Sequence, residues 1–308
     1  MQSVSETVDG RVITQGAKTP LVSVIVPVFN DQAGVERCLD AVAQQSYPLD
    51  QIEVIVVDNG STPPLSVTRQ YPFAAHVVRC ETPGSYAARN AGARMATGKV
   101  FTFTDADCWA DKDWLANGIR ALEQSSGRGV IGGEVTFATP TRPSAVALYQ
   151  CICGFGQAAN AREKFFSATA NLFCTATQFQ RAGPFDERLL SAGDREWCWR
   201  TVQAGAQVIH EPQAIVYTHP RTTLRGAIRQ ARRVVAGRRQ LRANGLAHLG
   251  AAPVAKRRSA WRAAVWILRN GDLSYWTRVR VLVVATIIRT AAALETLRLS
   301  LGARAERR

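Results

Sequence analysis

The chain has 308 residues, and its 38 Lys and Arg against 24 Asp and Glu give a formal net charge of +14 at pH 7. Hydrophobic residues make up 46% of the chain, which excludes a wholly disordered protein or a collagen-like repeat. The charge is uneven, because residues 221–308 hold 20 of the basic residues but only three of the acidic ones. We therefore expect a nearly neutral globular body and a basic segment whose partner is an anion: nucleic acid, a phosphorylated ligand or a lipid headgroup.

The start of the chain and the cysteines point to a cytoplasmic protein. Residues 1–20 are expected to form a flexible lead-in, because they lack the basic start and apolar run of a signal peptide. The longest apolar run, residues 281–288, is too short to span a bilayer. The seven cysteines are scattered and odd in number, which favours reduced, mostly buried thiols over a disulfide framework or a zinc site.

The first third of the chain alternates between strands and helices. Apolar runs predict strands at residues 21–29, 52–57, 76–80 and 100–104, and helices are expected at 31–46 and 85–96. This order is typical of an α/β fold with a mostly parallel central sheet flanked by helices. Polar groups follow three of the strands, namely Asn30-Asp31, Asp58-Asn59 and Asp105-Ala-Asp107. Because ligands bind beyond the carboxyl ends of parallel strands, we expect these carboxylates to gather along one edge of the sheet.

The rest of the chain changes from an irregular to a helical pattern. The middle third predicts, in order, a strand at 130–137, a helix at 144–161, a strand at 168–175, a helix at 194–204 and short strands at 208–209 and 215–217. From residue 222 the sequence predicts an amphipathic helix with an arginine face. A second helical stretch, about 275–301, is apolar nearly all round in its first half, which indicates close packing or contact with an apolar partner.

Asp105 and Asp107 are candidate ligands of a hard divalent cation, Mg²⁺ or Mn²⁺. Taken alone, such a pair is equally typical of a turn that precedes a helix. Its place in a series of motifs changes the interpretation. The series runs Pro27-Val-Phe-Asn30, Val57-Asp-Asn-Gly-Ser61, Ala87-Ala-Arg-Asn-Ala-Gly92, Asp105-Ala-Asp107 and Gly193-Asp-Arg-Glu-Trp197.

In the order and approximate spacing of these motifs, residues 22–219 resemble the family 2 glycosyltransferases. The resemblance implies a GT-A fold over residues 21–220, a Rossmann-like domain that binds a nucleotide-diphospho-sugar and a divalent metal, with inversion at the anomeric carbon as the usual outcome. Residues 221–308 would then be a basic helical C-terminal extension.

The resemblance also assigns residues to the donor. Pro27 and Phe29 would lie beside the nucleotide, Asp58 would accept a hydrogen bond from the base, and Arg89 would face the nucleotide or diphosphate. Asp105 would help to hold the ribose or the metal, and Asp107 would be the direct metal ligand. Without the resemblance, these residues would be assigned to strand-end packing, turn capping and a surface arginine.

A second set of residues is expected near the acceptor and the leaving group. Members of the family usually carry a Glu-Asp pair at the start of a helix, whereas this chain has Gly193 and Asp194, with Glu196 as the later acid. We expect both acids to be catalytic, with Asp194 as the general base. The alternative is that Asp194 and Glu196 only stabilise the first turn of the helix.

Aromatic and basic residues complete the predicted site. Trp197 and Trp199 would form part of an acceptor wall or pack in the core. His219 would lie near the metal or diphosphate or be structural, and Arg221 and Arg225 would hold the donor phosphates.

The favoured function is a metal-dependent inverting glycosyltransferase acting on a glycan or lipid-linked acceptor. Two alternatives remain: a sugar nucleotidyltransferase, for which the first strand lacks the glycine-rich phosphate loop, and an anion- or nucleic-acid-binding protein with a degenerate body. The basic face has few aromatic residues for stacking on bases, so nucleic acid is not the expected partner. The basic helices suit an anionic membrane instead, which predicts a peripheral protein at the inner face of the membrane.

Overall fold

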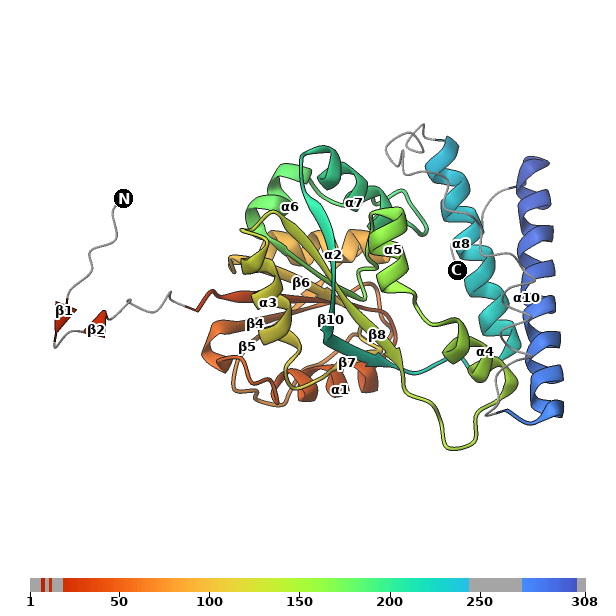
Figure 1. The fold of residues 1–308 in the computed structure, drawn as a ribbon, viewed down its shortest axis with the longest axis horizontal. Helices are drawn as coiled ribbons and strands as arrows, with labels where there is room; N and C mark the ends of the chain where they lie inside the picture. Colours follow the sequence, from red (N-terminus) through yellow and green to blue (C-terminus); the bar gives the residue numbers. More distant parts are fainter. Residues whose placement is uncertain (1–6, 9–10, 13–18, 244–272, 304–308) are drawn as a thin grey trace.

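The fold is described from a computed structural model, in which residues 7–8, 11–12, 19–243 and 273–303 are described (Figure 1). Most of the predicted lead-in lies outside these ranges, apart from the two-residue strands β1 (Thr7–Val8) and β2 (Arg11–Val12). Residues 244–272 and 304–308 of the predicted C-terminal extension also lie outside them.

An eight-stranded sheet forms the centre of the molecule. Its order is β5-β4-β3-β6-β9-β8-β10-β7, with β9 and β7 antiparallel to their neighbours and the other pairings parallel. This confirms the mostly parallel α/β sheet expected from the sequence. The strands are β3 (Val22–Val28), β4 (Ile52–Asp58), β5 (Ala74–Arg79), β6 (Val100–Thr104), β7 (Cys108–Ala110), β8 (Gly129–Phe137), β9 (Asn171–Thr175) and β10 (Gln207–Thr218).

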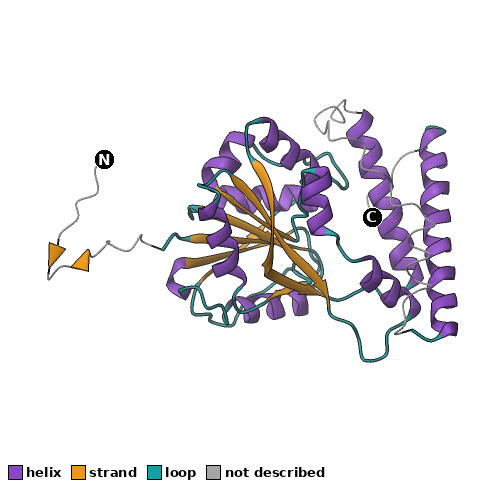
Figure 2. Ribbon diagram, viewed as in Figure 1, coloured by secondary structure: helices purple, strands orange, loops and turns teal. Residues whose placement is uncertain are grey.

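Helices cover both faces of the sheet because alternate strand residues pack on opposite sides (Figure 2). Val24 and Val26 of β3 pack with α1 (Gln32–Val42) and α3 (Trp114–Gln124). Ile25 points to the other face, where the cluster includes residues of α2 (Ser85–Met95), α6 (Ala176–Ala182) and α7 (Gly193–Gln203). Gly92 lets α2 approach closely, since a Cβ there would lie 2.6 Å from Cγ2 of Ile25.

Two long helices stand beside the sheet domain. α8 (Leu224–Ala243) and α10 (Tyr275–Ser300) lie side by side and pack with α4 (Ala145–Cys153), as Figure 1 shows. Val146, Ala227, Val284 and Ile288 form their shared apolar cluster. Glu295 of α10 is buried and accepts a hydrogen bond from Nε of Arg232 on α8, at 2.9 Å. The two described helices of the predicted extension therefore pack on α4.

The irregular middle third is where the structure differs from the sequence prediction. The helix expected over 144–161 is two helices, α4 and α5 (Gln157–Lys164), because Gly154 and Gly156 adopt positive φ angles of 58° and 66° between them. The two short strands expected at 208–209 and 215–217 are one strand, β10, with an irregularity in its pairing between Glu211 and Ile215. The elements that were not predicted include the short β7 and α6 and the 11-residue helix α3.

All seven cysteines are free thiols, and five of them are buried. Among the described residues, no helix combines the length and the hydropathy that crossing a bilayer requires.

Candidate active site

The carboxyl ends of β3, β4, β6 and β10 meet at one edge of the sheet, as parallel strands require. The turn of residues 105–107 follows β6 and lies against two other elements there. The hydroxyl of Thr218, the last residue of β10, donates to the carbonyl of Asp107 at 3.3 Å. Gly34 of α1 lies so close that a Cβ there would be 2.8 Å from the carbonyl of Ala106. The predicted gathering of carboxylates at this edge is thus present.

The carboxylate of Asp58 is surrounded by hydrogen-bond donors from the loop after β4 and from Arg79 of β5. One carboxylate oxygen accepts from the backbone N–H of Ser61 at 2.8 Å, and the other accepts from Leu65 N–H at 3.2 Å and from Arg79 at 2.7 Å. Although burial raises the pKa of Asp58, these hydrogen bonds outweigh it and hold the pKa below its usual value. Asp58 therefore anchors the loop after β4, and a direct contact with a base would require Arg79 to move away.

Arg89 links α2 to the turn after β6. Its guanidinium is ion-paired with Asp105 and stacks over the ring of Tyr86 at 5.6 Å, while its side chain is only 4% exposed. Nε of Arg89 is buried with no hydrogen-bond partner. The structure thus brings two predicted site residues, Arg89 and Asp105, into direct contact and leaves a buried donor next to them.

Asp107 is open to solvent but has mostly negative neighbours. Loss of hydration and the charge of Asp105, assisted by that of Asp31, raise the pKa of Asp107 to about 6, against the opposing charge of Arg221. Asp31 also caps α1, where its carboxylate accepts from Gly34 N–H at 2.9 Å. Asp107 therefore has two carboxylates nearby, Asp31 and Asp105, opposed by Arg221, while Asp105 is itself paired with Arg89.

Asp194 lies in the first turn of α7 and is held by a tyrosine. The hydroxyl oxygen of Tyr86 accepts from the backbone N–H groups of Gly193 at 2.9 Å and Asp194 at 3.3 Å. Burial raises the pKa of Asp194 and the charge of Asp105 adds to the rise, while the N–H of Arg195 and the charge of Arg89 oppose it. Asp105 is therefore close enough for its charge to affect the ionisation of Asp194.

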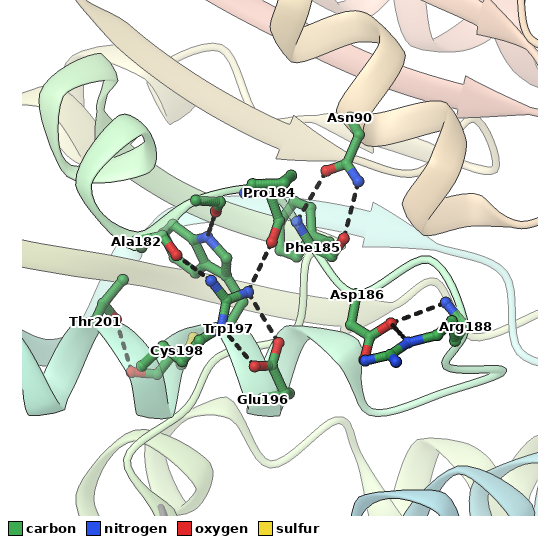
Figure 3. Close-up of polar contacts among 12 residues, drawn as sticks. Asn90, Ala182, Pro184, Phe185, Asp186, Arg188, Glu196, Trp197, Cys198 and Thr201 are labelled. Carbon is green, nitrogen blue, oxygen red and sulfur yellow. Dashed lines mark hydrogen bonds and ion pairs between the residues drawn. The ribbon is translucent and has the colours of Figure 1, made fainter. Parts of the chain in front are cut away.

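Glu196 points away from this group of carboxylates. Its carboxylate is paired with Arg200 through contacts of 2.5 and 2.9 Å. The same guanidinium donates to the carbonyls of Ala182 and Pro184, both labelled in Figure 3. Trp197, next in the chain, is fully buried and donates to the carbonyl of Gly183 at 2.9 Å. Both side chains hold the loop before α7. The structure therefore does not place the carboxylate of Glu196 with that of Asp194, and it does not place Trp197 in an acceptor wall.

The basic residues after β10 lie on the Asp107 side of the site. His219 is exposed and its ring lies 4.7 Å from that of Trp109. Arg221 donates to Gln150 through its backbone N–H and to Gln230 through Nε, at 2.6 and 3.1 Å, and its charge reaches Asp107. Arg225 is exposed on α8. No three His, Cys, Asp or Glu side chains converge as metal ligands in the described ranges, so His219 does not complete a protein-only metal site there.

Comparison with known proteins identifies the domain that carries this site. The model of glycosyl transferase family 2 matches residues 23–169. This match covers just under half of the chain and ends before Asp194, so it supports a family 2 glycosyltransferase domain over residues 23–169. Glycosyltransferase AglE of Haloferax volcanii is 36% identical over 193 residues, which cover 60% of this chain and 62% of that protein.

More distant matches agree on the fold. The pre-mycofactocin glycosyltransferase of Mycobacterium tuberculosis is 28% identical over 218 residues, covering 66% of this chain and 44% of that protein. The chain therefore spans less than two thirds of the length of either relative. A mannosyltransferase from Pyrobaculum calidifontis, solved in complex with GDP-Man and Mn²⁺, has a TM-score of 0.60 at 24% identity, covering 90% of this chain and 87% of that one. This likeness confirms the GT-A fold.

The departure at Gly193 has a structural reason in this family 2 domain. A Cβ at position 193 would lie 2.7 to 2.9 Å from ring atoms of Tyr86, so no side chain fits there without displacing the ring. Where the family usually has a glutamate, this chain has Gly193, and the tyrosine hydroxyl lies against the backbone of Gly193 and Asp194. The sequence could not show this, because positions 86 and 193 are far apart and only the fold brings them together.

Two further residues of the motifs act through loops. Asn90 donates to the carbonyl of Phe185 and accepts from its N–H, both at 2.9 Å, which fixes the segment before α7 (Figure 3). Asn59 donates to the carbonyl of Thr82 at 2.7 Å and accepts from Gly84 N–H at 2.8 Å, so it fixes the start of α2. Both residues lie within the motifs, but the sequence predicted no role for either.

Of the residues predicted beside the nucleotide, Pro27 is buried within β3, where it pairs with Val57 of β4. Phe29 follows that strand and is 41% exposed at the carboxyl edge. The structure therefore leaves the ring of Phe29, but not that of Pro27, open to a ligand.

Proposed function

We propose that this protein is an inverting glycosyltransferase that moves a sugar from a nucleotide-diphospho-sugar to an acceptor hydroxyl, with a divalent metal at Asp107 and Asp194 as general base. The observation that carries the proposal is the arrangement of Asp105, Asp107 and Asp194 around Arg89 at the carboxyl edge of a family 2 domain. The relatives and the mannosyltransferase bound to GDP-Man and Mn²⁺ support the class of donor.

At the donor end, the residues present fit a divalent cation. The raised pKa of Asp107 reflects lost hydration and neighbouring carboxylates, a repulsion that a bound Mg²⁺ or Mn²⁺ would relieve. Asp107 would be the direct ligand, and the donor diphosphate would supply the oxygens that the protein does not. The metal would neutralise charge on the departing nucleoside diphosphate. Arg221 lies on the same side and would bind a diphosphate oxygen, with Arg225 and His219 next to it.

Arg89 and Asp105 act on the other side of the donor. Their ion pair fixes the turn that carries Asp107, and the buried Nε of Arg89 is a spare donor for a nucleotide or ribose oxygen. Phe29 would stack beside the base. Asp58 would act mainly by holding the loop after β4 in shape.

At the acceptor end, Asp194 would take the proton from the attacking hydroxyl. Its raised pKa brings the carboxylate closer to the basicity that this step needs near neutral pH. A base on the side of the sugar opposite the leaving diphosphate would give inversion through a single displacement. Two backbone hydrogen bonds to Tyr86 hold the base in place.

We also propose that the extension, residues 221–308, places the domain of residues 21–220 on the cytoplasmic face of an anionic membrane, near a glycan or lipid-linked acceptor. The supporting observation is an exposed apolar stripe on α10. It contains Trp276, Val283, Ile287, Leu294 and Leu301. Exposed Arg280 and Arg289 on the same helix, with the net charge of +14, favour an anionic lipid surface as the occupant.

The test is a donor screen followed by a matched pair of variants. Thermal shifts with UDP, GDP, dTDP and CDP sugars in the presence of Mn²⁺ identify the donor, and release of the nucleoside diphosphate measures turnover. Asp194→Asn should reduce turnover by about 10²-fold or more and leave Mn²⁺-dependent nucleotide binding nearly unchanged. Full turnover by Asp194→Asn would remove it as the base, and the absence of any Mn²⁺-dependent donor binding would remove the proposed function.

A further inference from the structure

The helix α8 lies against the sheet domain near both of its ends. It begins just after Arg221, whose backbone N–H is bonded to Gln150, on the Asp107 side. Near its other end it presses on the segment before α7, since a Cβ at Gly237 would lie 2.4 Å from the carbonyl of Ser191. Gln240 accepts from Leu190 N–H at 3.0 Å at the same place. The helix therefore runs from the proposed metal ligand toward the proposed base, Asp194.

The flank of α8 that faces Arg221 carries arginines at successive turns. Arg225, Arg229 and Arg233 are spaced by four residues, so they lie on one side of the helix, and all three are exposed. None of them forms an ion pair with a carboxylate in the described part of the chain. Burial lowers the pKa of Arg221, and repulsion from Arg233 and Arg229 lowers it further. The charges of these arginines therefore converge on the Asp107 side of the site.

On the other side of α8, an arginine is paired with a carboxylate of the protein. Arg232 pairs with Glu295 at 2.9 Å, and Glu295 is also held by Arg298 at 2.7 Å. Among the described residues, the fold thus provides a carboxylate for Arg232, which faces α10, but none for Arg229 and Arg233. A cluster of like charges without counter-charge is unfavourable unless an anion binds there.

The donor alone does not account for this much positive charge. Its diphosphate would already be matched by a divalent ion at Asp107 and by Arg221. The acceptor must place its hydroxyl beside Asp194, and α8 reaches from Arg221 to the segment that precedes Asp194. We propose that Arg229 and Arg233 bind a phosphate group of the acceptor, so that the acceptor is a phosphorylated molecule rather than a neutral glycan. Guanidinium groups suit this because each offers paired donors to phosphate oxygens.

This inference rests on the proposed transferase function, and the experiment separates the two. Octyl phosphate and inorganic phosphate are titrated by calorimetry into the full chain loaded with Mn²⁺ and the nucleotide that gives the largest thermal shift. Octyl glucoside serves as the neutral probe with the same alkyl chain. The double variant Arg229→Gln/Arg233→Gln is compared with Arg239→Gln, which removes one exposed charge from another side of the same helix. The nucleotide is titrated into each variant in parallel.

We expect octyl phosphate to bind more tightly than octyl glucoside, and the double variant to bind octyl phosphate roughly tenfold more weakly or worse. Nucleotide affinity should stay unchanged in both variants, and Arg239→Gln should bind octyl phosphate like the wild type. If the wild type binds inorganic phosphate and the double variant does not, the phosphate group is recognised and not the alkyl chain.

Three results would overturn the inference. Equal octyl phosphate affinity in the wild type and the double variant would remove the phosphate site. A parallel loss of nucleotide affinity would assign Arg229 and Arg233 to the donor, and an equal loss in Arg239→Gln would show a diffuse charge effect. If no nucleotide binds at all, the proposed function fails, and the same titrations without nucleotide still test the arginines.

Discussion

At the scale of single residues, the site is governed by the balance between carboxylates and arginines. Asp105 is paired with Arg89, so its charge is matched within the protein. Asp107 and Asp194 have no arginine or lysine at hydrogen-bond distance in the described ranges, and both have raised pKa values. The two residues assigned to the chemistry are thus the ones whose ionised forms the apo protein disfavours, which is typical of functional carboxylates.

The raised pKa of Asp107 predicts a pH-dependent cost to folding. Because the pKa is about 6 in the folded state against an ordinary 3.8, the folded protein binds the proton more tightly, and stability falls as the pH rises from about 4 to 6. The neighbours that set this balance are Asp105, Asp31 and Arg221. Asp107→Asn should remove the cost and raise the free energy of unfolding at pH 7 by about 1 kcal/mol, allowing for solvent screening.

Urea unfolding without metal at pH 4 and pH 7 measures this effect. The stabilisation by Asn should appear at pH 7 and shrink at pH 4, and the variant should lose the additional stabilisation by Mn²⁺ with nucleotide. If Asp107→Asn is less stable than the wild type at pH 7, the carboxylate has a favourable partner that contradicts this account.

Tyr86 and Gly193 should behave as one unit. Gly193→Ala places a Cβ 2.7 Å from the Tyr86 ring and should cost about 1–3 kcal/mol of unfolding free energy. In a Tyr86→Ala background the ring is gone, so the same change should be neutral or stabilising, because Ala is the better helix former. A double-mutant cycle by urea unfolding measures the coupling. Additive costs would show that the two positions are independent.

The sequence predicted most site residues but not how they are connected. Asp105, Asp107, Asp194 and Arg89 could be named because motifs of fixed spacing carry them. The roles of Tyr86, and of Arg79 at Asp58, depend on contacts between distant segments, which periodicity does not encode. Glu196 was expected to be catalytic because of its place in a motif. Its carboxylate instead contacts Arg200, four residues later in the chain.

At the scale of elements, three loops are fixed by buried side chains of the motifs. Asp58 holds the loop after β4, Asn90 holds the segment before α7, and Glu196 with Arg200 holds the end of α6. Each polar group is bonded to backbone atoms that would otherwise lack partners. The regular strands followed from apolar runs, whereas the break between α4 and α5 depended on two glycines at positive φ, which the sequence permits but does not require.

Glu196→Gln should therefore affect stability more than chemistry. The variant leaves the charge of Arg200 without its carboxylate, which should cost about 1–3 kcal/mol of unfolding free energy. Turnover by the folded protein should stay within a few-fold of wild type. Asp194→Asn, two residues earlier on the same helix, is the matched comparison for activity. A loss of turnover in Glu196→Gln as large as that in Asp194→Asn, at unchanged stability, would restore Glu196 as a catalytic residue.

At the scale of the whole molecule, the basic extension has two different surfaces. The arginines of α8 lie toward the site, where Arg229 and Arg233 affect Arg221, while the apolar stripe of α10 faces solvent. The sequence predicted both helices and their composition. It did not predict this division, because which side of each helix is covered depends on packing with α4 and with the segment before α7.

The apolar stripe of α10 should be required for binding to anionic membranes. The triple variant Val283→Ser/Ile287→Ser/Leu294→Ser removes three exposed apolar side chains without touching Val284 or Ile288, which pack inward. Its affinity for vesicles of equimolar phosphatidylglycerol and phosphatidylcholine should fall roughly tenfold or more, since each buried side chain contributes about 1.5–3 kcal/mol. Met95→Ser, at a 54% exposed residue of the catalytic domain, is the control.

Vesicle sedimentation measures binding, and light scattering measures the mass of the protein in solution. Equal vesicle binding by the triple variant and the wild type would contradict the membrane assignment. A wild type that is dimeric and a variant that is monomeric, with the same vesicle binding, would assign the stripe to a second copy of the chain instead. Both proteins should bind vesicles more strongly at low salt, because the variant retains the arginines. The triple variant should lose only the part of vesicle binding that persists at high salt.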